Sequence, residues 1–189
     1  SANEETRPRA IGADDHVLGN PAAPVQAIVY TDLECPYCKR FHLRTLADLR
    51  TTFGDQLVVV YRHYPLKSRP QGVPEAEAAE CAYQLGGPDA FWRFVDAIFR
   101  TTSSNNSFDL ALLPTIASDV GLDPAGFEIC QRKGDGAVRV RADMTDGALL
   151  GVSVTPSIAL KRGSKVILIQ GDYPSRIKTA IEYLLTNPQ

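Results

Sequence analysis

Residues 25–38, with the sequence VQAIVYTDLECPYC, decide the fold of this chain. The apolar run over 25–30 predicts a central strand, and Pro36 then marks the start of a helix, a position that proline occupies at little cost. A thiol at the first turn of a helix faces unpaired backbone amides and the positive end of the helix dipole, which both favour the thiolate. This context predicts a redox-active dithiol, in which Cys35 is the nucleophile and Cys38, one turn further along, is the resolving thiol.

A structural zinc site is the alternative interpretation of a Cys-x-x-Cys pair, because two such thiolates are half of a tetrahedral site. A second pair of ligands would then be required. The other two cysteines, Cys81 and Cys130, are isolated in the sequence, and the histidines His16, His42 and His63 form no pair with zinc-ligand spacing. The sequence therefore favours redox chemistry, and we expect no metal and no other cofactor.

The size and composition of the chain are typical of one domain with a sizeable core. Of the 189 residues, 44% are hydrophobic, which is enough for a single core or for a core domain that carries one large insertion. Lys and Arg total 20 against 22 for Asp and Glu, a net charge of -2, so charge gives no reason to expect a nucleic acid or an anionic membrane as a partner.

The sequence lacks an apolar stretch of the roughly 20 residues that span a membrane. Its polar start, Ser1-Ala2-Asn3, leads us to expect a trimmed mature end from which an export signal has been removed.

Hydrophobic patterning predicts the elements that follow the dithiol. We expect a helix at about 36–53 and then a strand at 57–61, whose successive apolar residues are typical of burial on both faces. Helical segments fill 74–150, with a break at Gly86-Gly87-Pro88. A hairpin at about 157–169 and a final amphipathic helix complete an α/β fold, with helices packed against one mixed sheet.

Together the motifs resemble those of DsbA-like thiol:disulfide oxidoreductases of the thioredoxin superfamily. The resemblance is carried by the Cys-Pro-Tyr-Cys dithiol after a strand, by Thr155-Pro156 before the hairpin, and by the helical insertion between the second and third strands. It extends to GNPAAPV at 19–25 and to YRHYPL at 61–66, and so covers nearly all of the chain beyond residue 13. It points to the extracytoplasmic subgroup that contains the bacterial DsbA and BdbD proteins.

The resemblance implies a thioredoxin fold, a mixed β-sheet flanked by helices, with an inserted helical domain. We therefore divide the chain into a flexible N-terminal leader at 1–13, a first thioredoxin-like part at 14–73 that carries the dithiol, the helical insertion at 74–150, and a second thioredoxin-like part at 151–189 that carries the Thr-Pro loop. Two segments that are distant in the sequence are thus expected to form one thioredoxin-like domain.

The resemblance also implies roles for residues around the dithiol. In this family the proline that matches Pro156 is cis and lies against the dithiol, and the residue that matches Thr155 offers backbone groups to an incoming peptide. The two residues between the cysteines, Pro36 and Tyr37, tune the stability of the thiolate. Strongly oxidising members of the family have a Pro-His pair there, so we expect a milder reduction potential for this protein.

The chain departs from the family pattern in one respect. The family places a buried acidic residue on the first strand, six positions before the nucleophile, where it assists proton transfer at the inner cysteine; Val29 occupies that position here. Asp32 and Glu34 are nearer to the dithiol, and an ionised acid there would raise the pKa of Cys35. We interpret both as solvated loop residues, and we expect water to serve in proton transfer.

Two histidines lie within reach of the predicted site. His42 follows Cys38 by four residues and therefore lies on the same side of the helix, whereas His63 follows the second strand. Either could hydrogen bond near the thiols. A helix histidine beside an aromatic residue is more often half-buried in the core, and the sequence favours that interpretation of His42.

Cys81 and Cys130 fall on different predicted helices of the insertion, and neither belongs to a motif. Each could be an inert buried thiol. Some members of the family carry a second disulfide within the helical domain, and an even cysteine count in an oxidising compartment favours pairing. The resemblance therefore implies a structural disulfide between Cys81 and Cys130.

The expected activity is that of an extracytoplasmic dithiol oxidase, in the periplasm or cell envelope. A substrate thiolate would open the Cys35–Cys38 disulfide, and a second substrate thiolate would release the new disulfide into the exported protein. By resemblance, the partner that reoxidises the dithiol is a membrane protein of the DsbB or VKOR type. We expect a monomer that takes reduced or unfolded exported proteins as substrates and binds no nucleic acid.

Two other functions remain open on the sequence. An isomerase or reductase of the DsbG type is favoured by Pro36-Tyr37 and Thr155, which resemble the residues of those enzymes. Against it, the segment ahead of the fold is too short for the dimerisation domain of DsbG-type isomerases. A redox-inactive chaperone would instead bind unfolded segments in an apolar groove beside Pro156, with the cysteines serving structure alone.

Overall fold

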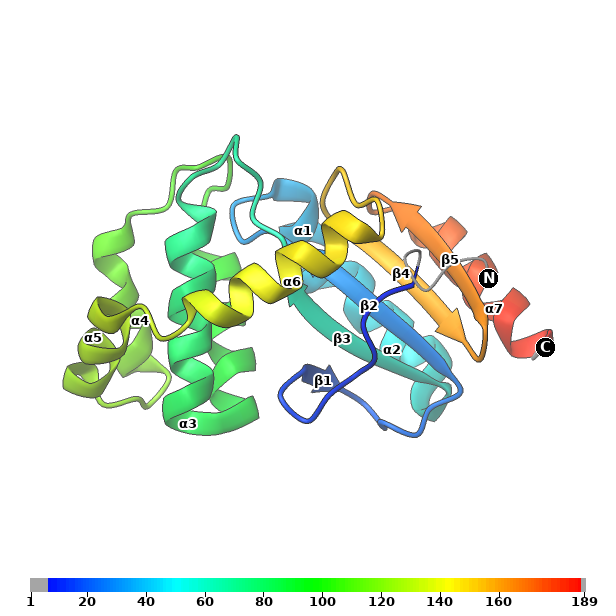
Figure 1. Ribbon diagram of the computed structural model, residues 1–189, viewed down its shortest axis with the longest axis horizontal. Helices are drawn as coiled ribbons and strands as arrows, with labels where there is room; N and C mark the ends of the chain where they lie inside the picture. Colours follow the sequence, from blue (N-terminus) through cyan, green and yellow to red (C-terminus); the bar gives the residue numbers. More distant parts are fainter. Residues whose placement is uncertain (1–6, 188–189) are drawn as a thin grey trace.

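A five-stranded mixed sheet forms the centre of the molecule (Figure 1); the computed structural model describes residues 7–187. The strands are β1 (His16–Leu18), β2 (Val25–Thr31), β3 (Leu57–His63), β4 (Ser157–Arg162) and β5 (Lys165–Gln170). Their order across the sheet is β1-β3-β2-β4-β5. Strands β2 and β3 pair in parallel, and the other neighbours pair antiparallel. This is the mixed sheet that the sequence predicts.

Strand β1 is an edge strand that the sequence-based prediction misses. It pairs antiparallel with β3, with His16 opposite Tyr61 and Leu18 opposite Val59. Three residues are too few to show the alternation of apolar and polar side chains by which a strand is recognised. The strand exists because the neighbouring β3 supplies hydrogen-bonding groups along that edge.

A continuous helical run follows the dithiol, as predicted for 36–53. It consists of α1 (Pro36–Arg40), the π-helical turn η2 (Phe41–Thr45) and α2 (Leu46–Phe53), and the 3-10 turn η3 (Gly54–Gln56) leads from it into β3. Gly54 ends the run with a positive φ of 50°, a backbone region that glycine adopts without a steric penalty. The helix that carries the dithiol is thereby joined closely to the second central strand.

Helices α2 and α7 (Pro174–Thr186) pack their apolar sides against one face of the sheet. Leu49 of α2 and Ile177 and Ile181 of α7 are fully buried there, in the same cluster as Ile158 of β4. Burial of a side chain of this size stabilises the fold by about 1.5–3 kcal/mol. The final amphipathic helix of the sequence prediction is therefore confirmed as a core element.

A group of helices is inserted between β3 and β4 and lies beside the sheet (Figure 1). Its elements are α3 (Gly72–Thr101), the 3-10 turn η4 (Leu110–Leu112), α4 (Leu113–Asp119), α5 (Pro124–Lys133) and α6 (Ala137–Leu149). Helix α3 is interrupted at Gly87, where φ is 73°, immediately before Pro88. The predicted break is thus present inside one long helical element. Among residues 7–187, no helix combines the length and the apolar character needed to cross a membrane.

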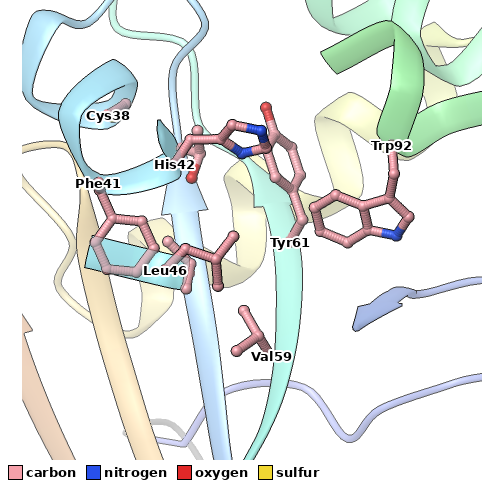
Figure 2. A pocket seen from close by; sticks show the side chains of 9 residues that line it. Cys38, Phe41, His42, Leu46, Val59, Tyr61 and Trp92 are labelled. Atoms are coloured by element: carbon pink, nitrogen blue, oxygen red, sulfur yellow. The ribbon is translucent and has the colours of Figure 1, made fainter. Parts of the chain in front are cut away.

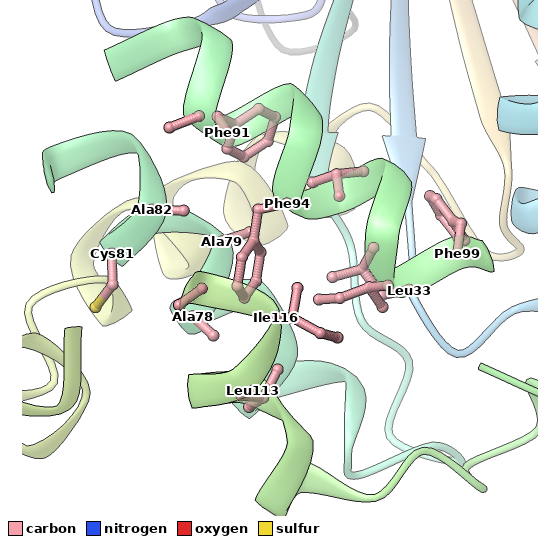
Figure 3. Close-up of a cluster of buried hydrophobic side chains, with 14 of the residues drawn as sticks. Leu33, Ala78, Ala79, Cys81, Ala82, Phe91, Phe94, Phe99, Leu113 and Ile116 are labelled. Carbon is pink, nitrogen blue, oxygen red and sulfur yellow. The ribbon is translucent and has the colours of Figure 1, made fainter. Parts of the chain in front are cut away.

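The inserted helices form a second core (Figure 3). Phe91, Phe94 and Phe99 of α3 are fully buried in it. Cys35 and Cys38 belong to the same cluster of contacting side chains. The dithiol therefore lies at the boundary between the sheet and the helical insertion.

Helix α6 crosses the opposite face of the sheet (Figure 1), and ion pairs with Arg62 hold it there. The guanidinium of Arg62 on β3 lies 2.6 Å from Asp146 of α6 and 3.1 Å from Asp15. Gly147 permits the close approach, because an added Cβ atom would lie 2.7 Å from the ring of Tyr64. An Arg62 side chain with no exposed surface is thus neutralised on both sides.

The predicted flexible leader at 1–13 lies partly outside the described residues, which begin at residue 7. Its later part is bound to α6. The guanidinium of Arg9 lies 2.9 Å from the carboxylate of Asp143, and the Arg9 amide donates to Asp146 at 2.6 Å. From Arg9 onward the segment is held against α6, because α6 supplies acidic partners for it. The local sequence does not reveal these partners.

Candidate active site

The dithiol lies where strand β2 ends and helix α1 begins. Cys35 is the N-cap residue of α1, with an extended backbone (φ -91°, ψ 123°), and Pro36 occupies the first helical turn. The Cys35 amide donates to the carbonyl oxygen of Asp32 at 3.0 Å, which closes the preceding turn. Both Cys35 and Cys38 are free thiols, with 2% and 1% of their surface exposed. The cysteine pair is therefore reduced, close to fully buried, and placed at a helix N-terminus.

The two thiols differ in acidity. The Cys38 thiol donates a hydrogen bond to Cys35, and this bond, helped by Thr155 and by the charge of Arg69, lowers the pKa of Cys35 to about 6 although burial opposes the shift. Burial raises the pKa of the Cys38 thiol well above its ordinary value. Near neutral pH, Cys35 is thus a thiolate while Cys38 keeps its proton, an asymmetry suited to a nucleophile and a resolving thiol.

The loop that contains Thr155 and Pro156 lies against the dithiol, and the peptide bond between these two residues is cis. The Cys35 sulfur lies 3.2 Å from the carbonyl oxygen of Thr155, to which the thiol form of Cys35 donates a hydrogen bond. The Gly171 amide donates to the carbonyl oxygen of Pro156 at 2.7 Å, which ties the loop to the segment after β5. Residues that are 120 positions apart in the sequence therefore share one site.

Arg69 is a site residue that the sequence analysis misses. Its Nε donates to the carboxylate of Asp32 at 2.9 Å, and its Nη2 donates to the hydroxyl of Thr155 at 3.2 Å. The residue lies in the irregular segment between β3 and α3, where neither a motif nor a periodic pattern signals a role. Its guanidinium links the loop ahead of the dithiol to the cis-proline loop.

A surface groove of about 460 Å³ runs beside the cis-proline loop, and its walls include Tyr37, Arg40, Thr155 and Tyr173. The two tyrosines are 56% and 51% exposed. Arg40 is held at 2.6 Å from Asp172, and its guanidinium lies 5.4 Å from the ring centroid of Tyr37. Exposed aromatic rings in the wall of a groove suit contact with the side chains of a peptide without strict sequence specificity.

Asp32 and Glu34 are buried, with 1% and 0% of their surface exposed, so the prediction that they are solvated is wrong. Asp32 accepts hydrogen bonds from Arg69 and from the Leu66 amide at 3.1 Å. Glu34 accepts one from the Thr102 hydroxyl at 2.5 Å. The donors come from segments distant in sequence, and together they replace the water that a buried carboxylate loses.

A small internal space lies beside Cys38 (Figure 2), and its walls include His42, Tyr61 and Trp92. Val29 also lines it, so the strand position where the family pattern expects an acid faces Cys38 but carries a hydrocarbon side chain. The volume of about 10 Å³ is near the lower limit for a single water molecule. Burial lowers the pKa of His42, and its ring is therefore neutral near pH 7.

Among the described residues, His63 makes no hydrogen bond to the thiols; it lies in a buried cluster with His16 and Glu80. The Nε2 atoms of His16 and His63 lie 2.5 Å and 2.8 Å from Oε1 of Glu80. Histidines that bind a metal normally hydrogen bond through their other ring nitrogen, but both Nδ1 atoms are without a partner among the residues described. We interpret the cluster as a hydrogen-bonded link between β1, β3 and α3.

The structure pairs Cys81 of α3 with Cys130 of α5 in a disulfide bond. Their Cα atoms are 5.8 Å apart, and the bond closes a loop with a sequence separation of 49. Cys81 lies in the core of the helical insertion. The bond therefore joins two inserted helices and involves neither cysteine of the dithiol.

The fold and the site define a member of the thioredoxin superfamily. A family model described as Thioredoxin matches residues 12–174, so the chain belongs to this family. Among similar solved structures, Pseudomonas aeruginosa DsbA2 has a TM-score of 0.79 at 24% identity, covering 95% of this chain and 98% of that one. Oxidised BdbD from Bacillus subtilis has a TM-score of 0.79 at 25% identity, covering 92% and 94%. The fold is thus the DsbA-like form of the thioredoxin fold, with α3–α6 as the inserted helical region, which confirms the predicted fold class.

The chain also matches part of longer curated proteins. The Na(+)/H(+) antiporter NhaA 1 of Mycolicibacterium gilvum is 31% identical over 147 residues, which are 76% of this chain and 23% of that protein. The antiporter NhaA of Herminiimonas arsenicoxydans is 30% identical over 168 residues, or 88% of this chain and 25% of that protein. The chain therefore spans about a quarter of the length of the curated relatives that it matches.

Proposed function

We propose that this DsbA-like thiol:disulfide oxidoreductase introduces disulfide bonds into exported proteins outside the cytoplasm. The observation that carries the proposal is the unequal acidity of the dithiol, in which the pKa of Cys35 is lowered to about 6 and that of Cys38 is raised by burial. A stabilised thiolate favours the reduced form, so the disulfide form is an oxidant. A dithiol of this kind gives its disulfide to a substrate.

The proposed reaction has two exchange steps. In the first, a substrate thiolate attacks the sulfur of Cys35, the Cys35–Cys38 bond breaks, and Cys38 leaves as a thiolate that takes up a proton. In the second, another substrate thiolate attacks the substrate sulfur of this mixed disulfide, and Cys35 leaves as a thiolate. Two electrons pass from the substrate to the enzyme, and the low pKa of Cys35 makes it a good leaving group.

The groove beside the cis-proline loop supports reduced or unfolded polypeptides as substrates. We propose that an extended substrate segment pairs with backbone groups near Thr155 and packs on Tyr37 and Tyr173, while Pro36 and Tyr37 tune the thiolate. The disulfide between Cys81 and Cys130 supports an oxidising compartment, because such bonds persist there and are rare in the cytosol. A membrane protein of the DsbB or VKOR type is the proposed reoxidant.

The experiment that tests the proposal is the recovery of ribonuclease activity, in parallel from reduced and from scrambled substrate. Wild type and Cys35→Ser are compared at equal concentration in a glutathione buffer. We expect recovery from reduced ribonuclease with wild type and none above background with the variant. Efficient recovery from scrambled ribonuclease would move the assignment to an isomerase. Suppression of aggregation by both proteins, without recovery of activity, would make the chain a chaperone.

A further inference from the structure

Glu75 is a buried carboxyl group to which the proposed reaction gives no role. It lies in the first turn of α3, has 0% of its surface exposed, and neither of its carboxyl oxygens has a hydrogen-bond partner within residues 7–187. An isolated carboxylate in such surroundings is strongly unfavourable, and the group keeps its proton instead. Glu75 is therefore neutral near pH 7.

Two other buried carboxyl groups lie near Glu75 and reinforce its protonation. Asp32 accepts hydrogen bonds from Arg69 and from two backbone amides, and Glu34 accepts them from Thr102 and from one backbone amide. Both have the donors that a buried carboxylate needs, whereas Glu75 has none among the residues described. Burial, together with the charges of Glu34 and Asp32, raises the pKa of Glu75 to about 9.

Glu75 lies in the turn of α3 that approaches the loop ahead of the dithiol. Helical spacing places it one turn before Ala79 (Figure 3), and the buried cluster that contains Ala79 also includes Cys38. At the start of the same helix, an added Cβ atom on Gly72 would lie 2.7 Å from Oδ1 of Asp32. The first turn of α3 is therefore in contact with the loop that leads to the dithiol.

The hydroxyl group of Tyr61 on β3 is a buried group whose acidity responds to the charges of both Glu75 and Cys38. Burial raises the pKa of Tyr61 well above its ordinary value, and the charges of Cys38 and Glu75 both contribute. The ring of Tyr61 lines the internal space beside Cys38 (Figure 2), and its oxygen has no partner in the described part of the chain. Glu75 and Cys38 thus lie within electrostatic reach of one buried hydroxyl group.

The other groups around Cys38 are poor proton sources near neutral pH. The space beside it holds at most about one water molecule, and apolar side chains such as Val29 form most of its wall. His42, in the same wall, is kept neutral by burial. Glu80, further along α3, faces two imidazole nitrogens that favour its carboxylate. Among these groups, Glu75 is the carboxylic acid that retains a proton.

We propose that Glu75 is the internal acid that supplies a proton to Cys38 when the disulfide opens. This proposal rests on the proposed function and concerns its first exchange step. A thiolate attacks the sulfur of Cys35, the disulfide bond breaks, and Cys38 leaves with the electron pair of that bond. The proton of the Glu75 carboxyl group passes to the Cys38 sulfur and leaves a carboxylate at Glu75. Beside Asp32 and Glu34 this new charge is unfavourable, and Glu75 regains a proton from solvent before the next cycle.

The test is the opening of the protein's own Cys35–Cys38 disulfide by dithiothreitol, followed by acid quench, alkylation of the thiols and mass spectrometry. Wild type, Glu75→Gln and the control Glu77→Gln, on the same helix, are compared from about pH 6 to about pH 10. Glutamine keeps the size of the side chain but has no acidic proton. We expect Glu75→Gln to react about 100-fold more slowly than wild type near pH 7, at the lower end of general acid catalysis. This difference should vanish above the pKa of about 9, where Glu75 of the wild type has lost its proton.

Two results would overturn the proposal: a wild-type rate in Glu75→Gln, or a rate that is slower by one constant factor at every pH, as a structural change would produce. Glu77→Gln should match wild type throughout. No protein substrate takes part, so the outcome is independent of the ribonuclease assay. If Glu75→Gln fails to fold, the infrared spectrum of wild type tests the proposal instead. A protonated carboxyl band near neutral pH that disappears as the pH rises through about 9 supports the proposal, and the absence of this band overturns it.

Discussion

At the scale of single residues, the acidity of Cys35 is set by neighbours from three parts of the chain. Cys38 belongs to the same helix, Thr155 to the cis-proline loop, and Arg69 to the segment between β3 and α3. A hydrogen bond donated to the sulfur by a side chain, or a positive charge near it, stabilises the thiolate more than the thiol, so each of these neighbours lowers the pKa. Arg69 also neutralises Asp32, and loss of the guanidinium would leave that buried carboxylate without its ion pair.

The replacement Arg69→Ala is therefore expected to raise the pKa of Cys35 from about 6 to about 7, because an attractive charge is removed and the negative charge of Asp32 is exposed to the thiolate. The measurement is the ultraviolet absorbance of the thiolate in the reduced protein as a function of pH, with Cys35→Ser as the blank. Lys67→Ala removes an exposed cation from the same segment and should leave the pKa unchanged. An equal rise in both variants would show that general surface charge, and not the ion pair with Asp32, acts on the thiol.

At the scale of elements, helix α3 connects the sheet, the dithiol and the insertion. Its first turn contacts the loop before the dithiol through Gly72. Its middle binds the histidines of β1 and β3 through Glu80, and the next residue, Cys81, is bonded to Cys130 of α5. Beyond the break at Gly87, the same element supplies the phenylalanines of the second core. Helix α3 therefore contacts both the dithiol site and the other inserted helices.

The disulfide is the covalent part of this connection, and its removal tests how much of the stability it supplies. The double variant Cys81→Ala/Cys130→Ala avoids leaving a single thiol. For a sequence separation of 49, the loss of loop-closure restraint predicts a decrease of about 4 kcal/mol in the free energy of unfolding, measured by urea denaturation. The pKa of Cys35 should not change, since the bond involves none of the groups that lower it, Cys38, Thr155 and Arg69. A decrease below about 1 kcal/mol would mean that the packing of α3 on α5 suffices without the bond.

At the scale of the whole molecule, the sequence predicts the features that depend on local pattern. Strand β2, the helical run after it and the final hairpin follow from apolar runs bounded by proline and glycine, which act over a few residues. The burial of Asp32 and Glu34 does not follow in this way, because acidic loop residues are usually solvated. Their donors, Arg69 and Thr102, reach them from segments that are distant in the chain. Burial of a polar group is decided by tertiary contacts, and these leave no local signal.

Glu75 is predicted to make the stability of the whole molecule depend on pH. Folding raises its pKa from an ordinary value of 4.5 to about 9, so its contribution to stability is full below pH 4.5 and is lost as the pH rises toward about 9. Glu75→Gln removes this loss. Its stability relative to wild type should therefore increase with pH between about 5 and about 8, by up to about 1.4 kcal/mol for each pH unit. Urea unfolding at about pH 5 and at about pH 8 measures the free energy of unfolding of the variant and of wild type. For Glu77→Gln, the difference from wild type should not change with pH. If the difference in unfolding free energy between Glu75→Gln and wild type is the same at both pH values, Glu75 is ionised in the folded protein. Glu75 would then have no proton to give to Cys38.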